Sequence, residues 1–357
     1  MSKERSGPTP ASDAVMVVHG PEAFDCGDAA WLAGRVRPRE MLVAGVMARC
    51  AALVSGLPVR CTDMRPSSLL GSLEGRAFLV NRGKTPESGR IFGEIVAGRT
   101  DGRRGLVQVE CSSRTIYLWN GGDRLLADDL AALTGYTVVE ANGCTPAPEG
   151  VRTIRGCVTG EAVFVNGIVI GKATADTVVL ASRDGQVEAV SGLAAKPHGL
   201  EKLGRAGAVD ITAAWCKSGS VRAAAPSSGD AVCPAGPIAV IDHCGHALYR
   251  ELERGVCGIL SIGDDTTAVC GHICSHYGIP VFGVIDGDAD AIVTAGYAPG
   301  SVVVEVLDGR DDDLGAEIAA ALDEEAPWDD WVADTLAALA GRVRVVVDLR
   351  GGDDAVR

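Results

Sequence analysis

The chain has 357 residues, enough for two or three domains, and 47% of them are hydrophobic and 22% charged. No apolar run reaches the roughly 18 residues that a membrane span needs, and the N-terminus lacks the apolar core of a signal peptide, so we expect a soluble, cytoplasmic protein. The net charge of −14 argues against broad electrostatic adhesion to nucleic acid, because such adhesion depends on Lys and Arg.

Strands and helices alternate over residues 14–141, after residues 1–13, which are predicted to form a disordered leader. Short apolar runs predict strands, and amphipathic stretches predict helices. The expected strands are 14–19, 41–46, 77–80, 106–110, 115–119 and 136–140, and the expected helices are 28–34, 48–55 and 123–133. This alternation is typical of a mostly parallel sheet, so we predict a Rossmann-like α/β domain over 14–141.

The next segment, 151–222, is predicted to contain a small antiparallel β module at 151–195 followed by a connection, and a turn-rich linker at 142–150 precedes it. Asn166-Gly167 and Asp184-Gly185 each lie between two β-rich runs, which is the strongest short-range signal for a hairpin. Residues 196–205 are expected to be a short polar connection, and residues 223–237 a further linker.

The α/β pattern resumes at residue 237 and continues to 350. Strands are expected at 238–242, 257–262, 280–285, 301–306 and 343–349, and helices at 244–253, 266–277, 313–323 and 328–340. The whole chain is therefore predicted to be α/β, with two sheet domains joined by the β module.

Acidic residues end three strands of this C-terminal domain. Asp242 ends the first strand, Asp264 and Asp265 follow the second, and Asp286 and Asp288 follow the third. Open α/β sheets bind ligands beyond the carboxyl ends of their strands. If the first and third strands adjoin, Asp242, Asp286 and Asp288 meet there and can hold Mg²⁺, which prefers oxygen ligands, while Asp264 and Asp265 assist catalysis. The alternative is a solvated turn, because Asp and Gly dominate turns.

The same segment, roughly residues 237–310, resembles the topoisomerase–primase (Toprim) domain. It shares the order of a strand ending in an acid, a helix, a strand ending in Gly-Asp-Asp, a helix, and the closing segment HYGIPVFGVIDGDAD. The resemblance implies a Toprim-like fold in which an acid after the first strand and a DxD pair hold Mg²⁺ for phosphoryl transfer. By position, Asp242 takes the place of the family's Glu, and Asp286 and Asp288 match the DxD pair. No segment resembles a winged-helix domain with a nucleophilic Tyr, so the resemblance does not extend to DNA cleavage.

Most of the chain also resembles an uncharacterised protein family of methanogenic archaea. The likeness rests on the segments VHGPEAFDCGDAAWL, VNGIVIG, KPHGLEKL, GDDTT and IPVFGVIDGDAD. This resemblance implies no activity.

Basic residues in loops are candidate phosphate ligands. Arg82 and Lys84 follow a strand of the first domain, and His198 and Lys202 belong to a polar segment that could reach over a site between domains. Each pair can instead belong to an ordinary loop or linker. His246, close in sequence to an acidic strand end, is the candidate general acid.

Soft-metal binding is a rival chemistry. Residues 243–276 contain four of the six histidines together with four cysteines, namely His243, Cys244, His246, Cys257, Cys270, His272, Cys274 and His276. Zinc sites usually pair these residue types at short, regular spacings, and only fragments of that pattern occur here. Zn²⁺ is therefore the less favoured metal, and buried thiols are the simpler interpretation.

Together these features predict a Mg²⁺-dependent enzyme of phosphoryl transfer or phosphoester hydrolysis that acts on a nucleotide or nucleic-acid substrate. Its partner would be a phosphate-containing small molecule or a nucleic-acid end, with no membrane involved. Two alternatives stay open: a non-catalytic regulatory protein that binds a nucleotide or a cation, and a metal-handling protein that uses the Cys and His residues.

Overall fold

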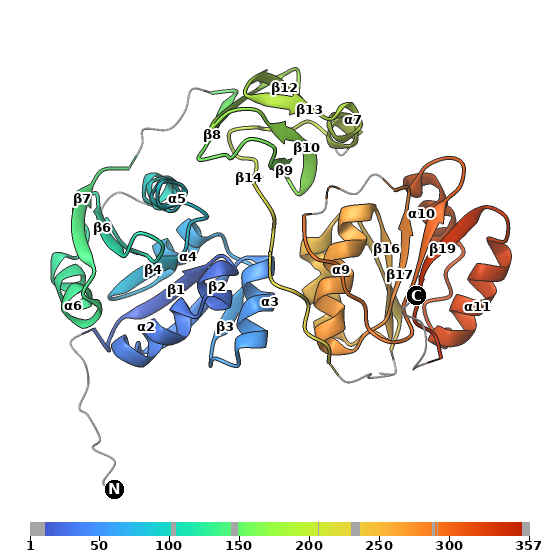
Figure 1. Ribbon diagram of the computed structural model, residues 1–357, viewed down its shortest axis with the longest axis horizontal. Helices are drawn as coiled ribbons and strands as arrows, with labels where there is room; N and C mark the ends of the chain where they lie inside the picture. Colours follow the sequence, from blue (N-terminus) through green and yellow to red (C-terminus); the bar gives the residue numbers. More distant parts are fainter. Residues whose placement is uncertain are drawn as a thin grey trace, which may run out of the picture.

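The structure, a computed structural model, describes residues 11–100, 105–143, 149–205, 207–229, 236–287, 290 and 292–351, without the side chain of His246. Figure 1 shows three units along the chain: an N-terminal α/β unit, a small β module, and a C-terminal α/β unit. In this view the β module lies above the other two units. Among the described residues, no helix is long and apolar enough to cross a membrane.

The N-terminal unit is built on a seven-stranded sheet in the order β3-β2-β1-β4-β5-β6-β7. Its strands are β1 (Val15–His19), β2 (Glu40–Ala44), β3 (Arg60–Thr62), β4 (Ala77–Asn81), β5 (Leu106–Glu110), β6 (Thr115–Trp119) and β7 (Thr137–Ala141). Strands β1 to β5 are parallel, β6 is antiparallel to β5, and β7 is parallel to β6. The predicted alternation of strands and helices around a mostly parallel sheet is confirmed.

Helices cover both faces of this sheet. They are α1 (Glu22–Asp25), α2 (Asp28–Val36), α3 (Val46–Ser55), α4 (Pro66–Ser72), α5 (Pro86–Arg99) and α6 (Arg124–Thr134). Apolar side chains of α1, α2, α3 and α6 pack on one face, and those of α4 and α5 pack on the other. The sequence patterns did not predict β3, α1, α4 or α5.

The β module consists of two small antiparallel sheets, in the orders β13-β10-β9-β14 and β12-β11-β8. Its strands are β8 (Val151–Arg155), β9 (Ala162–Val165), β10 (Ile168–Ala173), β11 (Thr177–Arg183), β12 (Gln186–Ser191), β13 (Leu193–Ala195) and β14 (Cys216–Ser218). Both predicted hairpins are confirmed. Two-residue hairpin turns need positive φ angles, and the four turn residues have them: Asn166, Gly167, Asp184 and Gly185.

A helix, α7 (Pro197–Arg205), occupies the segment that was predicted to be a polar connection. Gly199 and Leu203 form its buried face against β10. The contact is so close that a Cβ atom on Gly199 would lie 1.9 Å from the carbonyl oxygen of Val169. The prediction was wrong because this apolar stripe is narrow and stands among many charged residues.

The C-terminal unit is built on a five-stranded sheet in the order β15-β16-β17-β18-β19. Its strands are β15 (Ile238–Asp242), β16 (Gly258–Ile262), β17 (Val281–Ile285), β18 (Val302–Val306) and β19 (Val343–Asp348), and only β19 pairs antiparallel. Its helices are the 3₁₀ helix η1 (Gly245–Ala247), α8 (Leu248–Arg254), α9 (Asp264–Tyr277), α10 (Asp311–Ala320) and α11 (Trp328–Ala338). Helices α8 and α9 pack on the face toward the N-terminal unit, and α10 and α11 pack on the opposite face (Figure 1).

The expectation that strands β15 and β17 adjoin is wrong, because β16 lies between them. The reason is visible in their burial. Strand β16 is buried at every residue, as a central strand must be, whereas only two of the five residues of β15 are buried and this strand forms an edge. Asp242 and Asp286 therefore end strands that are not neighbours.

The same strand–glycine–helix unit occurs in both sheets. The segments β1-β2-α3-β3 and β15-β16-α9-β17 each contain three adjacent parallel strands in chain order. Gly45 precedes α3 and Gly263 precedes α9, with φ angles of +112° and +102°. A Cβ atom on Gly45 would lie 3.4 Å from the His19 ring, and one on Gly263 would lie 2.8 Å from the His243 ring. The two histidines thus hold equivalent places at the carboxyl ends of the two sheets.

A buried arginine joins the α/β units. Arg222, which follows β14 and is 2% exposed, donates two hydrogen bonds to Asp25 of α1, at 2.7 and 3.0 Å. It also lies 3.1 Å from His272 Nε2 of α9. His272 Nδ1 is 2.7 Å from the carbonyl oxygen of Thr294, so Nδ1 carries the proton and Nε2 accepts from Arg222.

Candidate metal centre

Three carboxylates meet at the carboxyl edge of the C-terminal sheet. Asp264 opens α9 after β16, Asp286 follows β17, and Asp311 opens α10. One oxygen atom from each lies within 4.8 Å of the other two. Asp264 and Asp311 are 7% and 0% exposed, and Asp286 is half-buried. We call this group the three-carboxylate site, and it lies where open α/β sheets bind their ligands.

Close packing of α10 on the sheet brings Asp311 to this edge. Helix α10 contacts β16, β17 and β18, and a Cβ atom on Gly315 would lie 2.6 Å from the Ile262 side chain, so glycine is needed for this approach. Asp311 lies about one helical turn before Gly315 and shares its face. Asp264 is held from the other side, because its Oδ2 accepts a hydrogen bond of 3.0 Å from the backbone N–H of Asp286.

The protein satisfies these carboxylates only in part. Asp311 Oδ1 accepts a hydrogen bond of 2.9 Å from the backbone N–H of Asp312. Asp286 Oδ1 and Asp311 Oδ2 are buried and have no hydrogen-bond partner among the described residues. Burial raises the pKa of Asp311; Lys202 opposes this shift, and the charge of Asp286 adds to it. Clustered carboxylates need a proton or a cation to relieve their repulsion, and an all-oxygen set suits Mg²⁺.

Asp265 lies beside the three-carboxylate site and is not one of its members. Its Oδ1 accepts a hydrogen bond of 3.2 Å from the backbone N–H of Asp290. Burial, together with the charge of Asp290, raises the pKa of Asp265 to about 6. Asp290 in turn pairs with Lys196 of the β module at 2.9 Å. A catalytic role for Asp265 stays a prediction.

A second group, formed by Asp242, His243 and Asp312, flanks the first. His243 Nδ1 lies 2.6 Å from Asp242 Oδ1, and its Nε2 lies 3.4 Å from Asp312 Oδ1. Burial lowers the pKa of His243, but the hydrogen bond and charge of Asp242 outweigh it, so the pKa is raised overall. Asp242 has a side chain 63% exposed, and it does not join Asp286 as the sequence analysis expected.

Two of the predicted phosphate ligands lie at this acidic edge. Lys202 Nζ is 3.6 Å from Asp311 Oδ1 and 3.3 Å from His243 Nε2, and its side chain is 13% exposed. His198 Nδ1 lies 3.4 Å from the Arg310 guanidinium. His198 Nε2 is buried and has no hydrogen-bond partner among the described residues. Helix α7 thus brings polar and cationic groups of the β module to the C-terminal sheet.

The other two predicted phosphate ligands belong to the N-terminal unit. Arg82 donates two hydrogen bonds to Asp28, at 2.5 and 3.0 Å. Lys84 pairs with Glu161 of the β module and donates a hydrogen bond of 3.0 Å to Ser218. Both cations are engaged in ion pairs, so the four predicted phosphate ligands do not form one site.

Two predicted site groups cannot be placed, because Asp288 and the side chain of His246 lie outside the described residues. Their roles stay predictions. Asp311 was not singled out from the sequence, although it belongs to the run Arg-Asp-Asp-Asp at 310–313. Acidic residues favour the first turn of a helix, and that run was the available signal.

The Cys- and His-rich window does not assemble a soft-metal site among the described residues. Neither of the two groups with metal-ligand spacing contains a cysteine. Cys270 and Cys274 are core residues of α9, and His272 and His276 hydrogen-bond to protein groups. The cysteines in the described part of the chain are free thiols.

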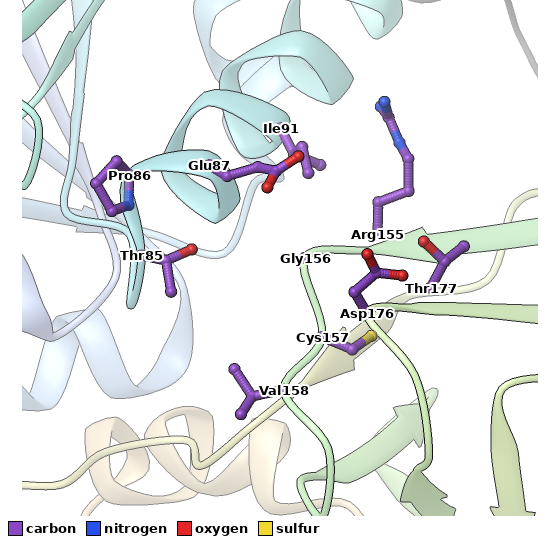
Figure 2. Close-up of a pocket in the computed structure, with 10 residues that line it drawn as sticks. All are labelled: Thr85, Pro86, Glu87, Ile91, Arg155, Gly156, Cys157, Val158, Asp176 and Thr177. Atoms are coloured by element: carbon purple, nitrogen blue, oxygen red, sulfur yellow. The ribbon is translucent and has the colours of Figure 1, made fainter.

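An open cavity of about 420 Å³ lies elsewhere, between the start of α5 and the β module. Figure 2 shows Glu87 on its α5 side and Arg155 and Asp176 on its β-module side. Arg155 is paired with Glu94 at 3.0 Å. No member of the three-carboxylate site lines this cavity, so it is separate from the candidate centre.

Comparison with known proteins finds archaeal relatives. A family described as "Uncharacterized protein conserved in archaea (DUF2117)" matches residues 16–326. The "Uncharacterized protein MJ0065" of Methanocaldococcus jannaschii is 30% identical over 332 residues, which cover 84% of this chain and 88% of that protein. No solved structure gives a significant match.

Proposed function

The chain belongs to this archaeal family, whose description names no reaction, and from its own side chains we propose a Mg²⁺-dependent enzyme of phosphoryl transfer or phosphoester hydrolysis. One observation carries the proposal. Asp264, Asp286 and Asp311 offer oxygen atoms within 4.8 Å of one another, and two buried oxygens, one on Asp286 and one on Asp311, have no hydrogen-bond partner in the described part of the chain. Such atoms cost free energy unless a ligand compensates them.

In this proposal the three carboxylates hold the ion. Mg²⁺ supplies positive charge that stabilises the charge developing on a transferring phosphoryl group. Asp264 and Asp311 stand on the first turns of α9 and α10, so rigid elements fix their positions before any ligand binds. Fixed geometry lowers the cost of reorganisation during the reaction.

The same proposal includes the fold type of the two α/β units, the substrate class and the location of the protein. The order β3-β2-β1-β4-β5 supports a Rossmann-like N-terminal unit, in which ligands bind where the strand order reverses. The acidic ends of β16 and β17 support a Toprim-like C-terminal unit, with Asp264 and not Asp242 as the acid beside Asp286. The substrate class is a nucleotide, a nucleic-acid end or another phosphate ester, and the expected location is the cytoplasm.

Metal binding and turnover test the proposal separately. The purified protein would be titrated calorimetrically with Mg²⁺ and Mn²⁺ and assayed for phosphate release from a panel of phosphate monoesters and nucleotides, with Mg²⁺ or with EDTA. We expect Asp286→Asn to lose both binding and turnover. Asp308→Asn removes an exposed carboxylate a few residues from the site and is the matched control, which should behave like the wild-type protein.

Each outcome decides one part of the proposal. If the wild-type protein binds neither ion, the three-carboxylate site is not a metal centre. If it binds metal but releases phosphate from no member of the panel, the enzyme is ruled out and the non-catalytic, cation-binding regulatory protein takes its place.

A further inference from the structure

The β module presents a charged face to the three-carboxylate site. Helix α7 packs its apolar side, Gly199 and Leu203, against β10, which turns its charged side toward the C-terminal unit. In Figure 1, α7 lies on the side of the β module nearer to that unit. Lys202 of α7 reaches Asp311 at 3.6 Å, and Lys196, just before the helix, pairs with Asp290 at 2.9 Å.

A histidine stands beside Lys202 from the sheet side. His243 follows β15 with a φ angle of +50°, and its ring occupies the space that a Cβ atom on Gly263 would fill. Asp242 fixes the ring through Nδ1 at 2.6 Å, so Nε2 is directed at Lys202, 3.3 Å away. Because Gly263 directly precedes the ligand Asp264, Lys202 and His243 stand next to the site from two different units of the chain.

We propose that Lys202 and His243 bind the terminal phosphate of a small-molecule substrate, on the side of the three-carboxylate site that faces α7. This inference rests on the proposed function and adds the residues that recognise the anion. A terminal phosphate carries about two negative charges and three free oxygens, so it can contact Lys202, His243 and the metal at once. Lys and His donors to phosphate form charge-assisted hydrogen bonds.

The charges at this edge couple the two ligands. A divalent cation on the carboxylates stands near the Lys202 ammonium, and like charges at such distances repel. A phosphate between them compensates both. Metal and phosphate are therefore expected to strengthen each other's binding by the same factor, as linkage requires.

The surroundings favour a small molecule over a nucleic-acid end. Lys202 is 13% exposed and Asp311 fully buried, so these groups are mostly shielded from solvent. Asp242, a carboxylate 63% exposed, lies beside these groups through its contact with His243. Together with the net charge of −14, this carboxylate repels a polyanion and adds little cost for one phosphate group.

Calorimetry with inorganic phosphate tests the inference on the full-length protein. Phosphate would be titrated without metal and at saturating Mg²⁺, with blank titrations for complexes in solution, and Mg²⁺ would be titrated alone. In the wild-type protein we expect Mg²⁺ to raise phosphate affinity at least about tenfold. Lys202→Met and His243→Gln should each lower the affinity at saturating Mg²⁺ by about tenfold to a hundredfold. Mg²⁺ alone should bind at least as tightly as before, because Lys202→Met removes the ammonium that repels the ion.

Matched variants separate recognition from folding. Lys172→Met removes an exposed cation of the same β module, and His19→Gln changes the equivalent histidine of the N-terminal unit, so both should bind phosphate like the wild-type protein. Lys202→Arg keeps the charge and should keep most of the coupling. Thermal melting of each variant reports whether it is folded.

The outcomes distinguish this inference from the proposed function. If the wild-type protein binds no Mg²⁺, the proposed function fails. If it binds Mg²⁺ but Lys202→Met and His243→Gln bind phosphate unchanged, only the recognition by Lys202 and His243 is refuted. If a 5′-phosphorylated oligonucleotide displaces phosphate at lower concentration than a nucleoside monophosphate does, the small-molecule preference is refuted in favour of a nucleic-acid end.

Discussion

Asp286→Asn should change stability in opposite directions in the metal-free and the metal-bound protein. Two unit charges at 4.8 Å repel by about 3 kcal/mol at an effective dielectric constant of about 20. Lys202, 3.6 Å from Asp311 Oδ1, compensates part of this repulsion already. We therefore expect the substitution to raise the free energy of unfolding of the metal-free protein by about 1 kcal/mol.

With Mg²⁺ present the order reverses. A ligand at a concentration of about 100 times its Kd stabilises the folded state by about 2.7 kcal/mol. The wild-type protein gains this stabilisation and the variant does not. Since about 2.7 kcal/mol outweighs about 1 kcal/mol, the variant becomes less stable than the wild-type protein by about 2 kcal/mol.

Urea unfolding followed by tryptophan fluorescence, in EDTA and in Mg²⁺, measures both free energies. Asp308→Asn is the control and should leave both close to wild type. A variant that loses more than about 1 kcal/mol in EDTA would show that Asp286 stabilises the fold itself. An equal response of variant and wild type to Mg²⁺ would show that Asp286 is no ligand. Either result refutes the reasoning.

Two further predictions concern the rest of the chain. Burial lowers the pKa of His19 from 6.5 to about 4. As the pH falls, the unfolded chain therefore binds the proton before the folded protein does. The contribution of His19 to the free energy of unfolding is fully present above pH 6.5 and decreases by on the order of 2–3 kcal/mol toward pH 4. His19→Gln should remove that part of the slope in urea unfolding across this range, and an unchanged slope contradicts the assignment. Arg222→Met should lower the free energy of unfolding by about 2–3 kcal/mol, because Asp25 and His272 lose a buried donor. Arg250→Met, at a side chain 75% exposed, should cost less than about 0.5 kcal/mol, and equal costs for the two arginines would refute the role of the buried contact.

The elements that could be predicted are those whose burial leaves a local pattern. Helix α5 left none, because its glycines lower its helix propensity. The structure gives their reason: a Cβ atom on Gly93 would lie 1.7 Å from Gln108, and one on Gly89 would lie 2.4 Å from Glu110. Both polar side chains come from β5 and are fully buried. The contacts between α5 and β5 therefore determine where this helix forms, and a short stretch of sequence does not show them.

The same limit applied to the site. Asp264 and Asp286 could be found because Asp286 directly follows β17 and only Gly263 separates Asp264 from the end of β16. Asp311 could not, because it reaches them only through the docking of α10 by Gly315. Asp242 was grouped with Asp286 by an assumption about strand order, and strand order depends on which strand the whole sheet buries. Local patterns therefore identified two of the three carboxylates that the structure brings together.

The two strand–glycine–helix units have the same backbone arrangement, but their histidines have different partners: a backbone carbonyl in the N-terminal unit and a carboxylate in the C-terminal unit. Their sequences share the segments GLPV at 56–59 and GIPV at 278–281. His19 Nδ1 bonds to the carbonyl oxygen of Ala44 at 2.9 Å, in a site where burial lowers its pKa. His243 Nδ1 faces the Asp242 carboxylate instead, and its pKa is raised.

The first residues of α3 and α9 also differ in charge. Helix α3 begins with Val46 and Met47, which belong to the apolar cluster between the units, whereas α9 begins with Asp264 and Asp265. Apolar groups bind no cation, so the start of α3 offers no counterpart of Asp264. The residues directly after the glycine thus differ in charge although the two units share a fold, and only the C-terminal unit places a carboxylate there.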